Sequence, residues 1–171
     1  SLSNPVVTIN VIDMGEIKIQ LFPRLAPNTV NNFIKYIEAG AYTDNLFHRV
    51  INGFMLQGGA VEDPTCTIEG EMTNNGFENP LLHYIGVISM ARVDGDYDSA
   101  SSQFFIVHQS SAFLNNEYAS FGGVVTGFHL VDYIASLNDA EVNEVTIAPV
   151  YIDSITVELN GYVPEEPICI S

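Results

Sequence analysis

The stretch from Tyr42 to Gly59 reads Tyr-Thr-Asp-Asn-Leu-Phe-His-Arg-Val-Ile-Asn-Gly-Phe-Met-Leu-Gln-Gly-Gly. Arg49 stands in its middle among apolar neighbours, and Phe54, Met55 and Gln57 follow. An arginine in such a strand is costly to bury unless its donors point into a cleft with a partner. The alternative is an arginine at a strand end whose head group reaches into water. The residues alone are compatible with two interpretations. Arg49 is either a charged donor at the edge of an apolar pocket or an ordinary surface arginine.

Short apolar runs on both sides of this stretch predict an antiparallel sheet. Apolar and polar residues alternate from Val7 to Val11 and from Ile17 to Leu21, which is typical of half-buried strands. The turn residues Asp13-Met14-Gly15 between them predict a hairpin. Further strands are expected over residues 47–57, 85–90, 103–107, 123–126 and 151–159. Many short strands favour a closed β-barrel, because closure removes exposed sheet edges.

Two segments have helical periodicity. In the first, Pro27 suits the opening turn, and Gly40 stands where a left-handed C-terminal residue is wanted. An apolar stripe with the spacing i, i+3, i+4 and i+7 lies between them, formed by Val30, Phe33, Ile34 and Ile37. The second expected helix runs from Phe128 to Leu137.

The length of 171 residues fits one domain, expected over residues 1–160, and the aperiodic residues 161–171 are expected to form a C-terminal tail. Cys66 and Cys169 are too few for the disulfide framework of a small secreted domain, so we expect them to stay unpaired. No apolar run approaches the roughly 20 residues that span a bilayer. The expected compartment is the cytoplasm, or the envelope or exterior if a signal was removed before Ser1.

The chain is strongly acidic, with 21 Asp and Glu against 5 Lys and Arg and a formal net charge of −16. Binding to nucleic acid or to an anionic membrane needs clustered cations, which five scattered residues do not provide. We therefore expect neither partner. Nothing in the sequence indicates an oligomer, so a monomer is expected.

Metal and cofactor motifs are weak. The four histidines have no zinc-ligand spacing, and no phosphate-binding glycine loop is present. Asp94, Asp96 and Asp98 have the spacing that opens an EF-hand loop. The sixth position of that loop is serine instead of glycine, and the twelfth is phenylalanine instead of glutamate. We read this segment as a polar surface loop, with a calcium-binding module as the alternative, and expect no metal and no cofactor.

The stretch from Tyr42 to Gly59 resembles the signature of the cyclophilin-type peptidyl-prolyl isomerases throughout. Three further blocks agree with that family: Gly86–Arg92, Ser99–Val107, and Phe113–Leu114 followed by Tyr118–Gly122. The resemblance covers about Val7 to Leu159, and its loops are more similar to bacterial members. It implies a mainly β fold, a closed eight-stranded antiparallel barrel capped by two α-helices. It also implies acceleration of X–Pro bond rotation in peptides and folding proteins, without covalent chemistry or a metal.

The resemblance implies a set of site residues. Those expected to act in catalysis are Arg49, Phe54, Gln57, Phe105, Leu114 and Tyr118. Those expected to bind substrate are His48, Met55, Ala91, Arg92, Gln103 and Phe113. Arg49 would be the principal catalytic residue, and apolar side chains would hold the proline ring.

Two positions depart from the family pattern. Phe113 stands where many members have Trp, and Tyr118 where many have His. Loss of the indole N–H donor predicts weaker binding of the cyclic peptide cyclosporin. Tyr118 keeps an aromatic wall and a hydroxyl donor, so we expect turnover to survive. The expected partners are proline-containing peptides and unfolded or partly folded proteins, and a non-enzymatic proline-peptide binder or holdase is the alternative.

Overall fold

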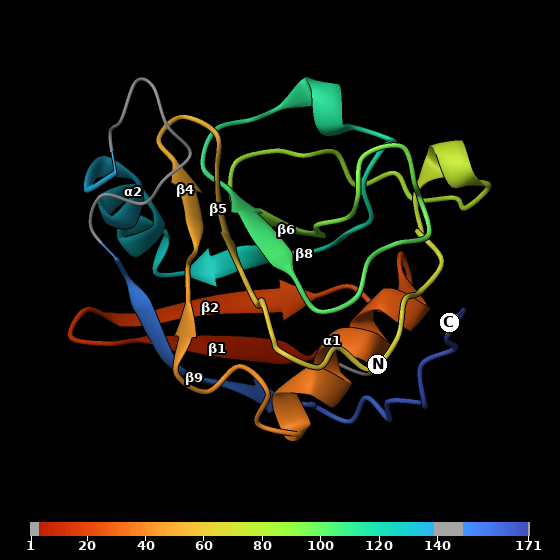
Figure 1. The fold of residues 1–171 in the computed structure, drawn as a ribbon, viewed down its shortest axis with the longest axis horizontal. Coiled ribbons are helices and arrows are strands. Elements are labelled where there is room, and N and C mark those ends of the chain that lie inside the picture. Colours follow the sequence, from red (N-terminus) through yellow and green to blue (C-terminus); the bar gives the residue numbers. More distant parts are fainter. Residues whose placement is uncertain (1–3, 139–148, 171) are drawn as a thin grey trace.

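The computed structural model describes residues 4–138 and 149–170, so Ser1 and Ser171, which bound the expected domain and tail, lie outside the described residues. One curled antiparallel sheet dominates the structure (Figure 1). Its strands are β1 (Val6–Val11), β2 (Gly15–Leu21), β3 (Asn45–Leu46), β4 (Arg49–Ile51), β5 (Met55–Gly58), β6 (Val87–Met90), β7 (Phe104–Val107), β8 (Ser120–Thr126) and β9 (Tyr151–Glu158).

The strand order explains how the sheet curls round on itself. It runs β3-β9-β1-β2-β8-β6-β7-β5-β4. The two end strands, β3 and β4, are separated in sequence only by Phe47 and His48, so the chain itself joins the two ends of the sheet. The mainly β antiparallel fold predicted from the resemblance is confirmed. Residues 4–138 and 149–170 contain nine strand segments where eight strands were expected. The run predicted over residues 47–57 is divided into β4 and β5, and the two-residue strand β3 precedes it.

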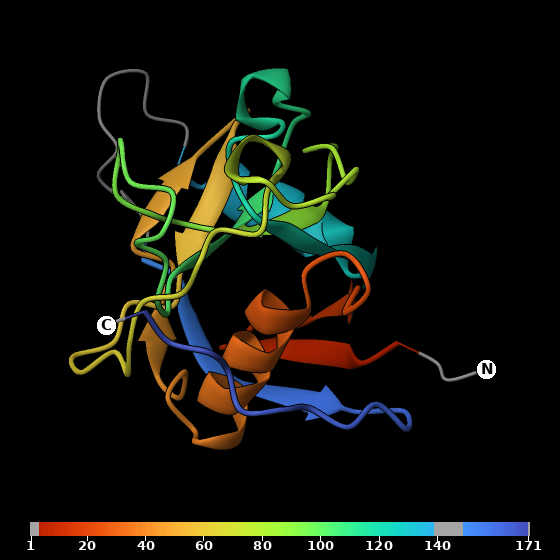
Figure 2. The same ribbon diagram turned by 90° about the vertical axis from the view of Figure 1, so that its right-hand side faces the viewer.

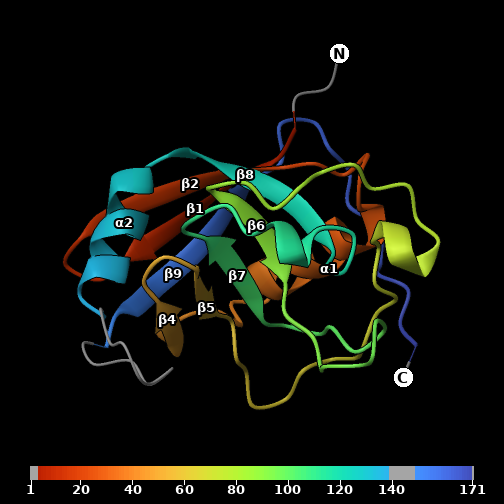
Figure 3. The same cartoon turned by 90° about the horizontal axis from the view of Figure 1, so that it is seen from above.

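Two α-helices, α1 (Pro27–Glu38) and α2 (Phe128–Ser136), lie at opposite ends of the curled sheet (Figure 3). Both were predicted from their periodicity. The stripe residues of α1 are buried in the main core. Gly40 has φ +71°, so the predicted left-handed residue closes this helix. Two short 3-10 turns, η1 (Thr73–Asn75) and η2 (Ala112–Leu114), lie in the long connections.

The first turn of α1 is capped by a residue that is remote in sequence. Ala26 at the N-cap has no side-chain acceptor. Instead the backbone N–H and the hydroxyl of Thr29 donate to Glu71 Oε1 at 2.6 and 2.7 Å. Glu71 is only 4% exposed, and its carbonyl accepts a hydrogen bond from Asn79. The buried Glu71 side chain thus satisfies one of the N–H groups that every helix leaves open at its start.

The strands β5, β6 and β7 are covered on both faces, and this positions the functional site. One face contributes Leu56, Ile88 and Ile106 to the main core, which continues under α1. The opposite face supports a second, smaller apolar cluster made of Met55, Val87, Phe105, Val107 and Leu114. Coverage on both faces explains why β6 and β7 are buried along their whole length instead of alternating.

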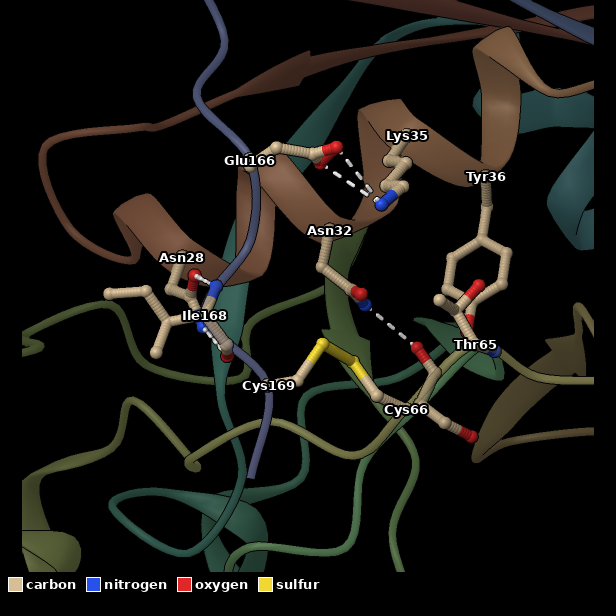
Figure 4. Close-up of a disulfide and its surroundings, with 10 residues drawn as sticks. Asn28, Asn32, Lys35, Tyr36, Thr65, Cys66, Glu166, Ile168 and Cys169 are labelled. Atoms are coloured by element: carbon tan, nitrogen blue, oxygen red, sulfur yellow. Dashed lines mark hydrogen bonds and ion pairs between the residues drawn. A yellow bond between two sulfur atoms is a disulfide. The ribbon is translucent and has the colours of Figure 1, made fainter. Parts of the chain in front are cut away.

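The chain after Gly161 runs past α1 as a segment without helix or strand over residues 162–170 (Figure 2). Asn28 of α1 makes two hydrogen bonds with the backbone of Ile168, and Lys35 pairs with Glu166 at 3.0 Å (Figure 4). This segment, whose sequence has no helical or strand periodicity, covers part of α1.

The prediction that Cys66 and Cys169 stay unpaired is wrong. They form a disulfide with a Cα–Cα distance of 5.7 Å that ties residue 169 to the loop after β5 (Figure 4). The reasoning from cysteine scarcity failed because one bridge suffices to fix a single terminal segment. A structural disulfide indicates an oxidising compartment. No helix within the described ranges is long and apolar enough to cross a membrane.

Candidate active site

Four polar and aromatic side chains form a row across neighbouring strands. In the sheet register Arg49 of β4 lies opposite Gln57 of β5, and Gln57 lies opposite Phe105 of β7. Phe105 in turn pairs with Ser89 of β6. Directly paired residues project from the same face of a sheet, so the register alone places these four side chains side by side.

A pocket of about 130 Å³ opens beside this row. Nine of the predicted site residues line it, namely Arg49, Phe54, Met55, Gln57, Ala91, Arg92, Phe105, Leu114 and Tyr118, and Asp94 is the tenth lining residue. The apolar walls belong to the second cluster, so Phe105 and Leu114 are not part of the main core. The result is an apolar recess with charged and amide groups at its rim.

A chain of amides supports Arg49. Its Nη1 donates to Gln57 Oε1 over a long 3.5 Å contact, and Gln57 Nε2 donates to Gln103 Oε1 at 2.9 Å. His48 does not line this pocket, but it hydrogen-bonds with Gln103. Burial lowers the pKa of His48 from its usual value, which that hydrogen bond partly offsets. The guanidinium of Arg49 is therefore the permanent charge of this row, beside a neutral imidazole at neutral pH.

Arg92 is largely occupied by protein groups. Its side chain is 8% exposed, with Nε donating to the carbonyl of Glu117 at 3.0 Å and Nη1 to that of Val93 at 3.1 Å. The guanidinium lies 4.3 Å from the ring centre of Tyr118 and 4.9 Å from that of Tyr97. Such cation–π contacts hold the Tyr118 ring in the pocket wall.

Glu117 completes this cluster. The Tyr97 hydroxyl donates to Glu117 Oε2 at 2.6 Å, and Glu117 lies 3.8 Å from the Arg92 guanidinium. The hydrogen bond from Tyr97, followed by that from Asn74, lowers the pKa of the Glu117 carboxyl. The ionised carboxylate therefore balances the charge of Arg92 in the groove.

His83 lies behind the pocket wall and was not singled out by the sequence. Its ring stacks on Phe105 at 6.0 Å between centres and meets the edge of Tyr118 at 6.4 Å. Its Nδ1 faces Asn115 Oδ1 at 3.3 Å, and its Nε2 faces Ser89 Oγ at 2.9 Å. The amide oxygen can only accept, so Nδ1 carries the proton and Ser89 donates to Nε2. Burial lowers the pKa of His83 to about 4, so it is neutral at neutral pH.

Phe113 is predicted to bind substrate, but it does not line the pocket. Its side chain is 71% exposed, and its ring lies 5.4 Å from that of Phe54. Phe54 does line the pocket, so Phe113 extends the apolar surface outward from the rim. An exposed aromatic ring at this place offers contact area to a ligand larger than one proline.

A second hollow of about 200 Å³ adjoins the first. It shares Gln57, Ala91 and Arg92 with the pocket, and Gln103 lines it further along. The predicted groove residues therefore lie together. Both hollows are open, which allows an extended chain to occupy them in succession.

The aspartate loop is used within the protein. Asp98 Oδ1 accepts from Asn75 at 2.8 Å and from the backbone of Gly70 at 3.1 Å, and Asp94 lines the pocket. Within residues 4–138 and 149–170, no group of three or more His, Cys, Asp or Glu could hold a metal ion. Sequence reasoning missed Asp94 as a pocket residue because it read the whole acidic run as one surface loop.

Comparison with known proteins agrees with this geometry. The sequence profile of the cyclophilin type peptidyl-prolyl cis-trans isomerases matches residues 6–157. The chain is 38% identical over 149 residues to peptidyl-prolyl cis-trans isomerase A of Dickeya dadantii, covering 82% of this chain and 78% of that protein. It is also 38% identical over 156 residues to isomerase B of Escherichia coli, covering 84% and 94%. Human peptidyl-prolyl cis-trans isomerase-like 3 is 35% identical over 160 residues, covering 88% and 94%.

Solved structures agree as well. A cyclophilin type isomerase of Cryptosporidium parvum, crystallised in the presence of the dipeptide Ala-Pro, superposes with a TM-score of 0.79. The sequences are 26% identical, and the match covers 90% of this chain and 98% of that one. The two proteins thus share one fold along almost their whole length.

Proposed function

Since the chain belongs to the cyclophilin-type peptidyl-prolyl cis-trans isomerases, we propose that the pocket beside Arg49 is where it rotates X–Pro bonds. The observation that carries this proposal is the placement of one guanidinium at the rim of an apolar recess sized for a proline ring. The similar Cryptosporidium parvum protein was crystallised with Ala-Pro, which supports a proline-containing peptide as the ligand of this pocket.

The reaction dictates what the pocket must do. Rotation about an X–Pro bond faces a barrier of roughly 20 kcal/mol because amide resonance is lost, and it takes about 10–100 s uncatalysed. In the twisted state the prolyl nitrogen becomes pyramidal and gains a lone pair. A donor near that nitrogen binds the twisted amide better than either planar form, which is the condition for catalysis.

The residues divide this work between them. Phe54, Met55, Phe105 and Leu114 hold the proline ring while the preceding carbonyl rotates. Arg49 donates toward the prolyl amide through its planar guanidinium. The bound proline ring displaces water from the recess, which strengthens the attraction between the guanidinium and the developing lone pair. No bond is broken, and no proton leaves the substrate.

Supporting contacts come from the rim. Gln57 and Tyr118 offer an amide and a hydroxyl to the substrate carbonyl, and Gln103, Ala91 and Arg92 border the adjoining hollow where neighbouring peptide residues would lie. His48 acts through Gln103 and orients the amide chain, since it lies outside the pocket. The physiological ligands of such a groove are extended, proline-containing segments of unfolded or partly folded proteins, bound by a monomer.

Cyclosporin binding should be weak, because the chain has no Trp and Phe113 stands exposed in its place. Phenylalanine supplies less contact area than Trp and no N–H donor. Phe113 does not line the proline recess, so the change from Trp to Phe leaves the recess unchanged. It should therefore weaken the binding of large cyclic ligands more than that of linear peptides.

Exchange NMR on a peptide with one Ala-Pro bond, with the protein at substoichiometric concentration, tests the proposal. We expect faster cis–trans exchange, and amide shifts on titration that cluster at β4, β5 and β7. Peptide binding at these strands without faster exchange would instead identify a holdase. Faster exchange with shifts confined to another surface would contradict the assignment of the pocket.

A further inference from the structure

We propose that His108 is a positioning residue for the β4–β5 hairpin, which carries Arg49 at one end and Phe54 in its turn. His108 follows β7 directly and is not among the residues that line the pocket. Its imidazole instead accepts the backbone N–H of Gly53 at Nδ1, at 2.9 Å. The inference rests on the proposed roles of Arg49 and Phe54, and adds to them what holds the hairpin in place.

The hydrogen bonds define which tautomer His108 must have. A backbone N–H only donates, so Nδ1 must present its lone pair to Gly53. The ring proton therefore lies on Nε2, which is 2.8 Å from Oδ1 of Asp132 on α2 and donates to it. Asp132 stabilises the one tautomer that the turn requires. This is the arrangement by which a carboxylate commonly orients an imidazole.

Packing leaves the imidazole little freedom. His108 is 5% exposed, and its ring stacks on Phe128 of α2 at 6.4 Å and 15° between planes. The helix α2 itself packs against β4 and β5, and lies beside β4 in Figure 1. The side chain of Asp132 is 71% exposed, so its hydrogen bond from Nε2 by itself contributes little to stability. The buried contact with Gly53 is the part that matters for the hairpin.

His108 holds two peptide groups of the turn, one on each side of the Gly53–Phe54 peptide bond. Its ring accepts from the N–H of Gly53, and its own backbone N–H donates to the carbonyl of Phe54 at 2.8 Å. Gly53 has φ +81°, a conformation that other residues avoid. Phe54 follows it directly and forms a pocket wall, so a loosened Gly53 would shift that wall. Shifts of about 1 Å near reacting groups can cost about 100-fold in rate.

Two substitutions separate positioning from simple packing. His108→Phe keeps a ring to stack on Phe128 but removes the acceptor, whereas His108→Asn places its Oδ1 where Nδ1 was and restores an acceptor. We expect kcat/KM for an X–Pro peptide to fall about tenfold or more in His108→Phe, and to recover to within about threefold of wild type in His108→Asn. The matched control is His129→Phe on the exposed face of α2, which should leave kcat/KM unchanged.

Asp132 gives a second test, which acts through the hydrogen-bond partner of Nε2 and leaves the His108 side chain in place. Asp132→Ala should lower kcat/KM by about threefold, because the tautomer is no longer selected, and should have no further effect in the His108→Phe background. Wild-type kcat/KM in His108→Phe, or equal losses in His108→Phe and His108→Asn, would overturn the inference. If Arg49→Ala is inactive while His108→Phe is fully active, the inference alone fails and the proposed function stands.

Discussion

At the scale of single residues, the site depends on side chains whose partners lie far apart in the sequence. Arg49 and Gln57 are eight residues apart, but Gln57 and Gln103 are separated by 46 positions. The role of Arg49 could be predicted only from the resemblance of its segment to the family signature, because the residues themselves fitted a surface arginine equally well. The roles of His83 and His108 could not, because each depends on an acceptor or donor that only the folded chain supplies.

His83 makes stability depend on pH. Burial lowers its pKa to about 4, whereas the unfolded chain binds the proton at about 6.5. Its contribution is therefore fully present above about pH 6.5 and is lost as the pH falls toward about 4, by about 3 kcal/mol. Urea unfolding of His83→Gln should show a shallower decline over this interval than wild type. The exposed His129→Gln serves as control, and equal slopes in wild type and His83→Gln would refute this assignment.

At the scale of elements, the periodic helices and strands could be predicted, whereas contacts between segments far apart in the sequence could not. The stripe of α1 and the left-handed Gly40 follow from sequence spacing alone. The cap of α1 does not, because Glu71 belongs to a segment without helix or strand and reaches Thr29 across 42 positions. The division of residues 47–57 into β4 and β5 was signalled by Asn52 and Gly53, but the pairing of β3 with β9 was not.

Loss of the remote cap should destabilise α1. Glu71→Ala leaves the Thr29 N–H and hydroxyl without their acceptor in a buried place, which costs about 1–3 kcal/mol. Glu71→Gln keeps an amide oxygen there and should lose less. Chemical unfolding followed by circular dichroism measures both, with the exposed Glu38→Ala as control. An Ala variant as stable as wild type would show that the cap carries no stability.

At the scale of the whole molecule, the disulfide was the feature that composition misjudged. Two cysteines in a chain of 171 residues gave no framework pattern, and their separation of 103 positions hid the pairing. The pairing follows from the path of an aperiodic segment along α1, which no periodicity could reveal. The net charge, by contrast, could be counted from the composition, and it acts on ligands through the field of the whole protein surface.

Reduction of the disulfide should lower stability without abolishing isomerase activity. Closing a loop of this length restricts the unfolded chain, and the corresponding stabilisation is about 4–5 kcal/mol in the chain-entropy description. Neither cysteine lines the pocket, so kcat/KM below the melting temperature should stay near wild type in a Cys66→Ser, Cys169→Ser variant. Wild-type protein treated with dithiothreitol should match that variant in Tm. An unchanged Tm in both would contradict a stabilising role.

The acidic surface should select among peptides. With a net charge of −16, and with Arg92 facing Glu117, the protein repels anionic chains that approach the groove. At low salt, X–Pro peptides rich in Glu should therefore have a lower kcat/KM than matched peptides rich in Lys. The difference should shrink at high salt, where charges are screened. Equal values at low salt would mean that the charge has no effect on ligand choice.

The most direct test of the account is the kcat/KM of Arg49→Ala with an X–Pro peptide, compared with Arg49→Lys and with Arg24→Ala, whose exposed arginine is not among the pocket residues. We predict a loss of about 100-fold or more for Arg49→Ala with the fold intact, because a preorganised donor to the twisted amide is gone. Arg49→Lys should also be poor, since an ammonium lacks the planar fork, and Arg24→Ala should match wild type. An Arg49→Ala protein that isomerises the peptide as fast as wild type would contradict the account.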